Sequence, residues 1–185
     1  MDQKLNKRAL LDDIFPDNER LPRQLEISFR EQKIGDAVSV SIYYEGNIVG
    51  DRLTDNSNFE DFFRFHDVFH LANAAILGWS PCLRRILRCK RRSNFRVDEV
   101  EDGGRAVLIE EAVAAIMHKY ARREICSNTA IDMISILTVG LEVETVGREI
   151  WYRTLSEGNR VFDQLVASRG GQVICDLYER SLVFI

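Results

Sequence analysis

The chain has 185 residues, of which 45% are hydrophobic and 29% are charged, a balance typical of a soluble globular protein. Its length suits a single domain spanning residues 1–185. The net charge of −4 gives no global electrostatic reason to bind long nucleic acid or a membrane surface. No apolar stretch reaches the ~18 residues of a spanning helix. The charged N-terminus lacks an apolar signal core, so we expect a cytoplasmic protein.

The first fifty residues divide into two parts. Residues 1–22 are charged, with apolar residues at helical spacing before Pro16. This pattern predicts a short N-terminal helical segment that ends at the proline. Residues 23–50 alternate between apolar and polar side chains around glycine-containing breaks. The alternation predicts a small antiparallel sheet of two or three strands.

From residue 54 onward the apolar spacing predicts a helical core that extends to residue 185. Gly78 is a natural helix stop, and Ser80 and Pro81 are typical of a helix start. We therefore expect a mainly α (α+β) protein, a helical bundle with a small N-terminal antiparallel β-sheet. The expected helices span residues 59–77, 82–92, 105–124, 129–143, 149–168 and 172–185, with a polar, acidic connector over residues 93–104.

Two of the three histidines lie four residues apart in an otherwise apolar run. On a helix, His66 and His70 stack one above the other with Asp67 beside them, which suits a divalent metal ion. Burying such groups costs several kcal/mol unless they are paired or hold a metal. We predict His66, Asp67 and His70 as metal ligands. The alternative is a histidine strip that faces solvent.

A second helix, apolar nearly all round, carries adjacent carboxylates at Glu110 and Glu111. Buried carboxylates need cationic or metal partners. We expect Glu111 to complete the metal site, Glu110 to position or deprotonate water, and Asp67 and both glutamates to be catalytic. His118 lies two turns from Glu111 and is a candidate partner for it. The alternative for His118 is a helix-end histidine near solvent.

Charged residues between these helices supply further candidates. Glu99 and Asp102 belong to an acidic run that precedes two glycines, and they are candidate supplementary acids. Guanidinium groups match phosphate oxygens, so basic residues near the site are candidate phosphate ligands. For both charge runs the alternative is a solvated surface. The candidate phosphate-binding residues are Arg64, Lys90, Arg91 and Arg105.

The four cysteines are scattered without a CxxC pair. Cys82 and Cys89 are seven residues apart, which is poor spacing for a compact zinc knuckle. We expect reduced, partly buried thiols without a chemical role.

Eight short strings of the chain form a recognisable set. They are GDRLTDN at 50–56, RFHDVFH at 64–70, LGWSP at 77–81, KRRS at 90–93, DEVEDGGRA at 98–106, EEA at 110–112, GLEV at 140–143 and the glycines at 170–171. Together they resemble the MazG-like nucleotide pyrophosphohydrolases, in particular the module at the C-terminus of some members. The resemblance covers roughly residues 21–185. It implies an all-α-type context, magnesium or manganese, and cleavage of a nucleoside triphosphate to monophosphate and pyrophosphate.

The chain departs from the usual MazG acid pattern of Glu-x-x-Glu on one helix and Glu-x-x-Asp on a later one. His66, Asp67 and His70 fill the first position, and Ala114 stands where the later helix should carry an acid. The His-Asp dipeptide also resembles the HD phosphohydrolases, but the further histidine that they need upstream is missing.

Three functions remain open at this point. The first is a metal-dependent hydrolase of nucleotides that cleaves a phosphoanhydride bond with a divalent cation, magnesium or manganese, with zinc as an alternative. The second is a module that senses a nucleotide, or partners a catalytic subunit, without turnover. The third is a structural dimerisation domain, and for all three we expect a homo-oligomer.

Overall fold

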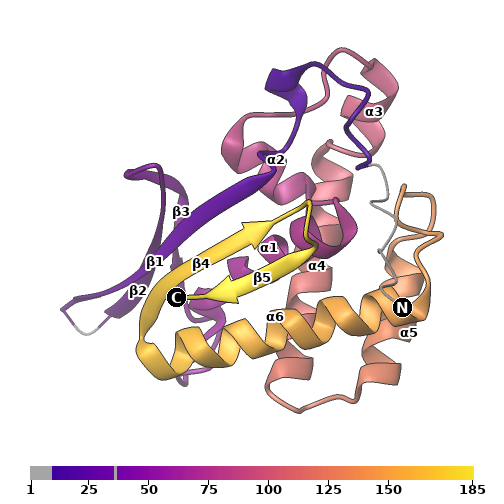
Figure 1. Ribbon diagram of the computed structural model, residues 1–185. Helices are drawn as coiled ribbons and strands as arrows, with labels where there is room; N and C mark the ends of the chain where they lie inside the picture. Colours follow the sequence, from indigo (N-terminus) through magenta and orange to yellow (C-terminus); the bar gives the residue numbers. More distant parts are fainter. Residues whose placement is uncertain (1–9, 36) are drawn as a thin grey trace, which may run out of the picture.

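The computed structural model describes residues 10–35 and 37–185 and combines one antiparallel sheet with several helices (Figure 1). The sheet has five strands in the order β3-β2-β1-β4-β5. The strands are β1 (Gln24–Ile34), β2 (Ala37–Tyr44), β3 (Asn47–Thr54), β4 (Gly170–Asp176) and β5 (Ser181–Phe184). The helices are η1 (Asp17–Glu19), η2 (Phe63–Phe65), α1 (Asp67–Leu77), α2 (Pro81–Leu87), α3 (Phe95–Val100), α4 (Gly104–Ala121), α5 (Ser127–Leu137) and α6 (Arg148–Ser168).

The expectation of a helical bundle with a small N-terminal sheet is wrong, and so is the all-α context that the resemblance implied. Residues 172–185, predicted to be helical, instead contribute most of strand β4 and all of strand β5. In the register of the central strand, Ile27 lies opposite Tyr44 of β2 and also opposite Val173 of β4. A short apolar run reads equally as helix or strand. Here the run forms a strand because it pairs with β1, which lies near the other end of the chain.

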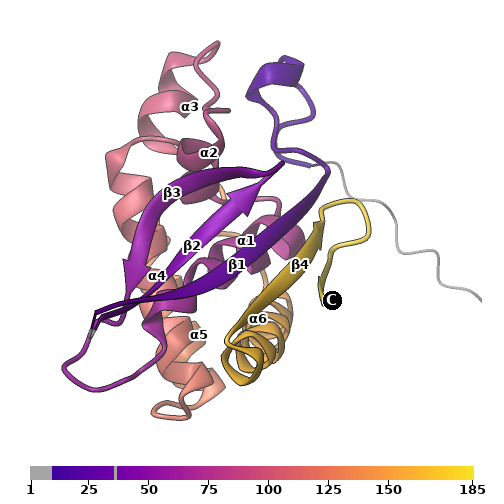
Figure 2. The same cartoon turned by 90° about the vertical axis from the view of Figure 1, so that its left-hand side faces the viewer.

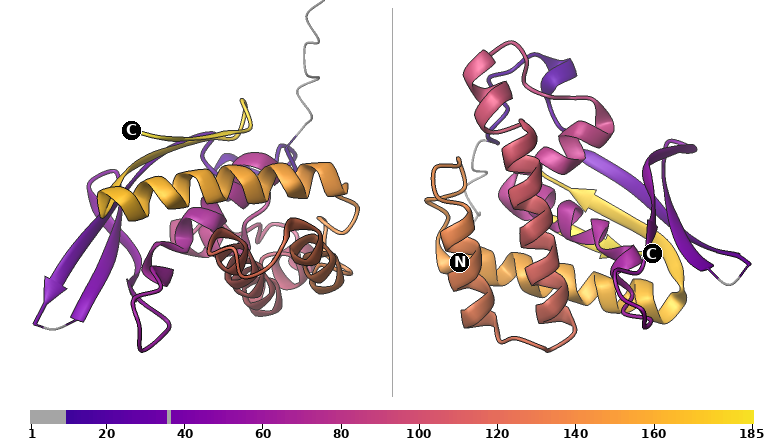
Figure 3. Two further views of the ribbon diagram at one scale, coloured as in Figure 1. Left: turned by 90° about the horizontal axis from the view of Figure 1, so that it is seen from below. Right: turned by 180° about the vertical axis from the view of Figure 1, so that it is seen from behind.

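The helices cover one face of the sheet and leave the other face open (Figures 2 and 3). Leu25, Ile27 and Phe29 of β1 are buried on the inner face, as strand alternation requires. Every residue of α1 is buried, and α1 contacts β4, β5, α4 and α6. A Cβ added to Gly158 of α6 would lie 3.2 Å from the Cβ of Ala72, so this glycine lets α6 approach α1 closely. The helix bearing both histidines is therefore the centre of the core.

Local chemistry shifts several predicted boundaries. Phe62 adopts a left-handed conformation, so the helix predicted from residue 59 begins only at Asp67, after the turn η2. Ser80 caps α2 as expected, since its Oγ accepts a hydrogen bond from the Leu83 amide at 3.0 Å. Arg88 is also left-handed and ends α2 short of residue 92. The connector predicted over 93–104 contains the short helix α3.

The N-terminal segment behaves differently from its prediction. Residues 1–9 lie outside the described part of the chain, and residues 10–16 form turns rather than a helix. Within residues 10–35 and 37–185, no helix combines the length and the apolar character needed to cross a membrane.

A buried chain of ion pairs connects residues 10–16 to the helical part of the protein. Asp12 pairs with Arg84 at 2.6 Å, and Arg84 lies 3.8 Å from Asp102. Asp102 pairs with Arg91 at 2.7 Å, and Arg91 reaches Glu142 at 2.8 Å. We call these five residues the arginine network. It joins the N-terminal turns, α2 and the loop after it, the loop before α4 and the loop after α5.

Candidate metal centre

The histidines meet because a tight turn precedes α1. The Asp61 carboxylate accepts a hydrogen bond from the Phe63 amide at 3.0 Å, and Phe62 then takes its left-handed conformation. His66 stands at the N-cap of α1, with Asp67 as the first helical residue. One turn later, His70 falls on the same side of the helix as His66.

Four side chains from α1, its N-cap and α4 converge. We call His66, Asp67, His70 and Glu111 the candidate metal centre, or metal centre for short. The Oδ1 of Asp67 lies 3.2 Å from His66 Nε2 and 3.7 Å from His70 Nε2. The carboxylate of Glu111 lies 3.5 Å from each of the same two nitrogens. Ligand atoms of His66, Asp67 and His70 therefore lie within 4.8 Å of one another, and the Glu111 carboxylate lies beside both Nε2 nitrogens.

The opposite nitrogen of each imidazole is occupied. His66 Nδ1 lies 2.9 Å from the backbone oxygen of Phe63, and His70 Nδ1 lies 3.2 Å from Glu110 Oε1. An oxygen at this distance requires a proton on Nδ1, so a metal ion would bind through Nε2. Metal-binding histidines are usually oriented in this way.

Glu110 lies behind His70 and not beside the opening of the site. It is fully buried, and its Oε2 accepts a hydrogen bond from the backbone amide of Cys82 at 2.7 Å. Its Oε1 accepts one from the side-chain amide of Asn73 at 3.2 Å. This geometry does not suit the predicted role of deprotonating water, and it suits the orientation of His70.

The charges in the centre are coupled. Burial lowers the pKa of the His70 imidazole, but Glu110 and Cys82 together outweigh burial, and the pKa lies well above its ordinary value. The neighbouring imidazoles of His66 and His70 hold the pKa of Glu111 well below its ordinary value. A proton on His70 thus balances the carboxylates, and a cation bound at the same point would replace it.

The centre is closed on one side and accessible on the other. A small apolar cavity of about 10 Å³ separates Asp67 and His70 from the sheet. The Glu111 side chain is 45% exposed, whereas the His70 side chain is only 2% exposed. Glu111 therefore marks the side from which a ligand can enter. The cavity is lined by Ile27, Phe29, Ile42, Val49, Leu71, Leu83 and Ile86 together with Asp67 and His70.

The predicted phosphate-binding residues have other partners. Arg64 is fully buried and pairs with Glu31, Asp55 and Glu60, and Arg91 belongs to the arginine network. Lys90 pairs with Asp98 at 2.6 Å, and Arg105 donates to the backbone oxygen of Val139 at 3.2 Å. The structure does not bring these cations to the metal centre.

The predicted supplementary acids and the predicted partner of Glu111 also lie elsewhere. Asp102 is buried against Arg91, and Glu99 is exposed on α3. His118 Nε2 lies 2.8 Å from the backbone oxygen of Asp61, and its ring packs edge-on against Phe63. His118 therefore supports the turn before α1 and is not a partner of Glu111.

Sequence reasoning missed Cys82. Its thiol is buried and lies 3.6 Å from Glu111 Oε1, and burial raises the pKa of this thiol. Only its position at the start of α2, which follows from Ser80 and Pro81, could have drawn attention to it. Among the described residues, the two groups able to hold a metal ion are His66, Asp67 and His70, and His70, Cys82 and Glu110.

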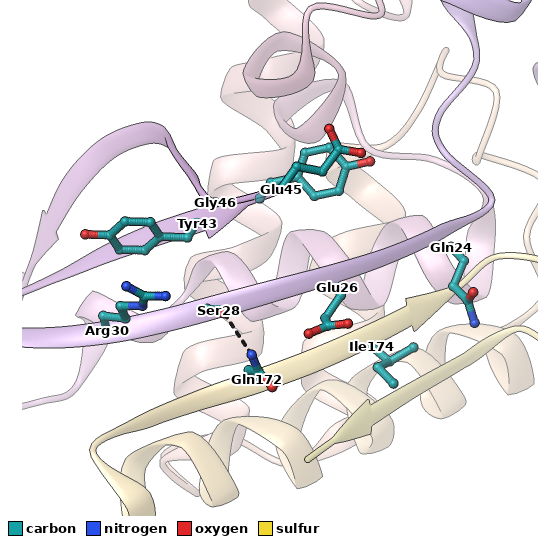
Figure 4. Close-up of a pocket in the computed structure, with 10 residues that line it drawn as sticks. Gln24, Glu26, Ser28, Arg30, Tyr43, Glu45, Gly46, Gln172 and Ile174 are labelled. Carbon is teal, nitrogen blue, oxygen red and sulfur yellow. Dashed lines mark hydrogen bonds between the residues drawn. The ribbon is translucent and has the colours of Figure 1, made fainter.

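A separate hollow of about 530 Å³ lies on the open face of the sheet (Figure 4). Its polar side chains come from β1, β2, the turn after β2, and β4, and Ser28 accepts a hydrogen bond from Gln172 at 3.4 Å. The inward neighbours of these residues belong to the core, so the sheet itself separates the hollow from the metal centre. The hollow is lined by Gln24, Glu26, Ser28, Arg30, Tyr43, Tyr44, Glu45, Gly46, Gln172 and Ile174.

Comparison with known proteins gives one match. The family model described as the MazG C-terminal domain matches residues 6–185. No curated protein and no solved structure matches the chain. Because the match covers nearly the whole sequence, the chain belongs to the MazG C-terminal domain family.

Proposed function

We propose that this protein is a metal-dependent hydrolase that cleaves a phosphoanhydride bond of a nucleotide. The observation that carries the proposal is the convergence of His66, Asp67, His70 and Glu111, with nitrogen-to-oxygen distances of 3.2–3.7 Å. Family membership supports the nucleotide, because the family is related to nucleotide pyrophosphohydrolases.

In this proposal the exposure of each side chain of the metal centre determines its role. His66, His70 and Asp67 are the inner ligands, and Glu110 holds the His70 ring in position through Nδ1. A bound divalent ion supplies Lewis-acid polarisation of a phosphate oxygen and activation of water. Glu111 is the exposed member, so its carboxylate is placed to accept a hydrogen bond from an attacking water and to orient it.

A nucleotide panel incubated with zinc, manganese or magnesium tests the proposal through the release of pyrophosphate and phosphate. We expect turnover by the native chain and by Glu99→Gln, which changes an exposed acid outside the centre. Glu111→Ala should lose that turnover. Equal release by all three proteins, or by none, would contradict catalysis at this centre.

A nucleotide-sensing module is the second candidate, and one observation favours it. Arg64 and Arg91, the predicted phosphate ligands, pair with internal carboxylates. The negative charge of a bound phosphate would therefore be balanced chiefly by the metal ion. Calorimetry with the metal-loaded protein separates the two functions. Nucleotide binding without product release would favour the sensor.

A further inference from the structure

We infer that the metal centre is built for a borderline transition ion of the Zn²⁺ type and not for Mg²⁺, with the thiolate of Cys82 as an additional ligand. The inference rests on the metal centre of the proposed function, but it does not require hydrolysis. It departs from the magnesium or manganese that the family resemblance implies.

The first argument is the nitrogen content of the centre. Two of the four converging groups are imidazoles, and both have Nδ1 occupied and Nε2 directed inward. Mg²⁺ prefers oxygen ligands and retains several water molecules in its coordination shell. Imidazole nitrogen suits Zn²⁺ and its transition-metal neighbours. The donors on α1 therefore favour an ion that binds nitrogen.

The second argument is the space around the ion. The side chains of His66, Asp67 and His70 are 9%, 12% and 2% exposed, which leaves little room for bound water on their side. The nitrogen-to-oxygen separations between the converging atoms are 3.2–3.7 Å. Neighbouring ligands in a zinc shell are about 3.3–3.4 Å apart, whereas neighbouring ligands of octahedral Mg²⁺ are about 2.9 Å apart. The spacing thus suits a transition ion with few ligands better than octahedral Mg²⁺.

The third argument is the sulfur. Cys82 Sγ lies 3.6 Å from Glu111 Oε1, and it lies within 4.8 Å of a His70 nitrogen and a Glu110 oxygen. The backbone amide of Cys82 is held by Glu110 at 2.7 Å, so α2 presents the thiol to the centre in a fixed position. Cysteine sulfur is a ligand of Zn²⁺ and a poor one for Mg²⁺.

An independent observation points to a ligand at the same place. The Nε2 atom of the buried His70 ring has no aligned hydrogen-bond partner within the described structure, although the carboxylates of Asp67 and Glu111 approach it. Buried polar atoms in native proteins normally have such partners. An ion bound at Nε2 would supply the partner that this nitrogen of His70 lacks. Binding would release the Cys82 proton to solvent and leave the thiolate on the metal.

Titration with Co²⁺ under reducing conditions tests the inference without any measurement of activity. Tetrahedral Co²⁺ should give visible absorption bands, and a thiolate ligand should add a near-ultraviolet charge-transfer band. Cys82→Ser should lose the charge-transfer band and bind Co²⁺ at least ~10-fold more weakly. Cys89→Ser is the matched control, because Cys89 is also buried but lies outside both metal-binding groups. It should keep the band.

X-ray absorption of the zinc-loaded native chain makes the test independent of any variant. We expect a sulfur neighbour at about 2.3 Å beside the nitrogen and oxygen shell. A hundredfold excess of Mg²⁺ should not displace the zinc. Nitrogen and oxygen alone around the zinc, or displacement by Mg²⁺, would overturn the inference while leaving the hydrolase proposal standing. Failure to bind Co²⁺ or Zn²⁺ at all would overturn both.

Discussion

The metal centre and the arginine network are both buried and both rich in charge, but they balance that charge differently. In the network, Asp102 has Arg91 at 2.7 Å and each arginine has carboxylate partners. In the centre, no lysine or arginine of the described residues pairs with Asp67, Glu110 or Glu111, and only imidazoles face them. Charges that are already paired serve the fold, whereas converging ligands without a fixed cation are available to bind one.

Breaking the network should give the largest effect on stability. Arg91→Ala leaves Asp102 buried without its closest cation, and removal of one partner of a buried ion pair costs about 3–5 kcal/mol. Urea denaturation should show this loss in the free energy of unfolding. The exposed neighbour provides the control, and Arg92→Ala should change stability by less than about 0.5 kcal/mol. Similar values for both variants would mean that the network is not structural.

Breaking the metal centre should instead affect ion binding. His66→Ala removes one of the two inward Nε2 donors, and we expect the affinity for Zn²⁺ to fall at least ~100-fold, since even indirect supports of a ligand are worth 10–100-fold. Competition with a chromogenic chelator measures the change. His118→Gln replaces the remaining histidine, which bonds Asp61 and not the centre, and should bind normally. Our assignment would be wrong if the His118 variant bound Zn²⁺ more weakly and the His66 variant bound it with unchanged affinity.

The carboxylate behind His70 should have an intermediate effect. Glu110→Gln retains an acceptor for the Cys82 amide but removes the charge facing His70 Nδ1. We expect Zn²⁺ affinity to drop ~10–100-fold, as for other groups that orient a metal-binding histidine. The native fold should survive by circular dichroism. Unchanged affinity would show that Glu110 does not position His70.

Protonation of Asp12 at low pH should weaken the arginine network, and we expect this change in the free energy of unfolding to be the smallest of the predicted effects. Burial raises the pKa of this carboxyl, but Arg84, the Leu21 amide and Arg23 together outweigh burial, and the pKa lies below its ordinary value of 3.8. A carboxyl with a lowered pKa stabilises the folded state above its ordinary pKa, and this contribution is lost as pH falls through the folded value. The unfolding free energy of the native chain should therefore fall below about pH 4 more steeply than that of Asp12→Asn. Asp17→Asn, at an exposed position, should follow the native curve.

The sequence allowed some of these features to be predicted because their signals are local. Alternation placed strands between residues 23 and 50, and the structure has β1, β2 and β3 over residues 24–54. Helical spacing aligned His66 with His70, and the burial cost of adjacent glutamates linked Glu111 to them. The structure brings these side chains within 3.5 Å, while their chemical role remains our proposal.

The rest depends on partners that are distant in the sequence. Strand β4 forms because Val173 meets Ile27 of β1, and no local pattern indicates that pairing. Arg91 resembled a phosphate ligand until Asp102 and Glu142 were found around it. Cys82 reaches the centre only through the packing of α2 against α4. Tertiary contacts thus decided which charged residues belong to the site.

A crystal structure of the zinc-loaded protein, with an anomalous difference map at the zinc edge, tests the central claim most directly. The account predicts one strong peak about 2.0–2.3 Å from His66 Nε2, His70 Nε2 and the Asp67 carboxylate, at the side where Glu111 is exposed. A map with no peak between α1 and α4, or with zinc only at surface residues, would contradict it.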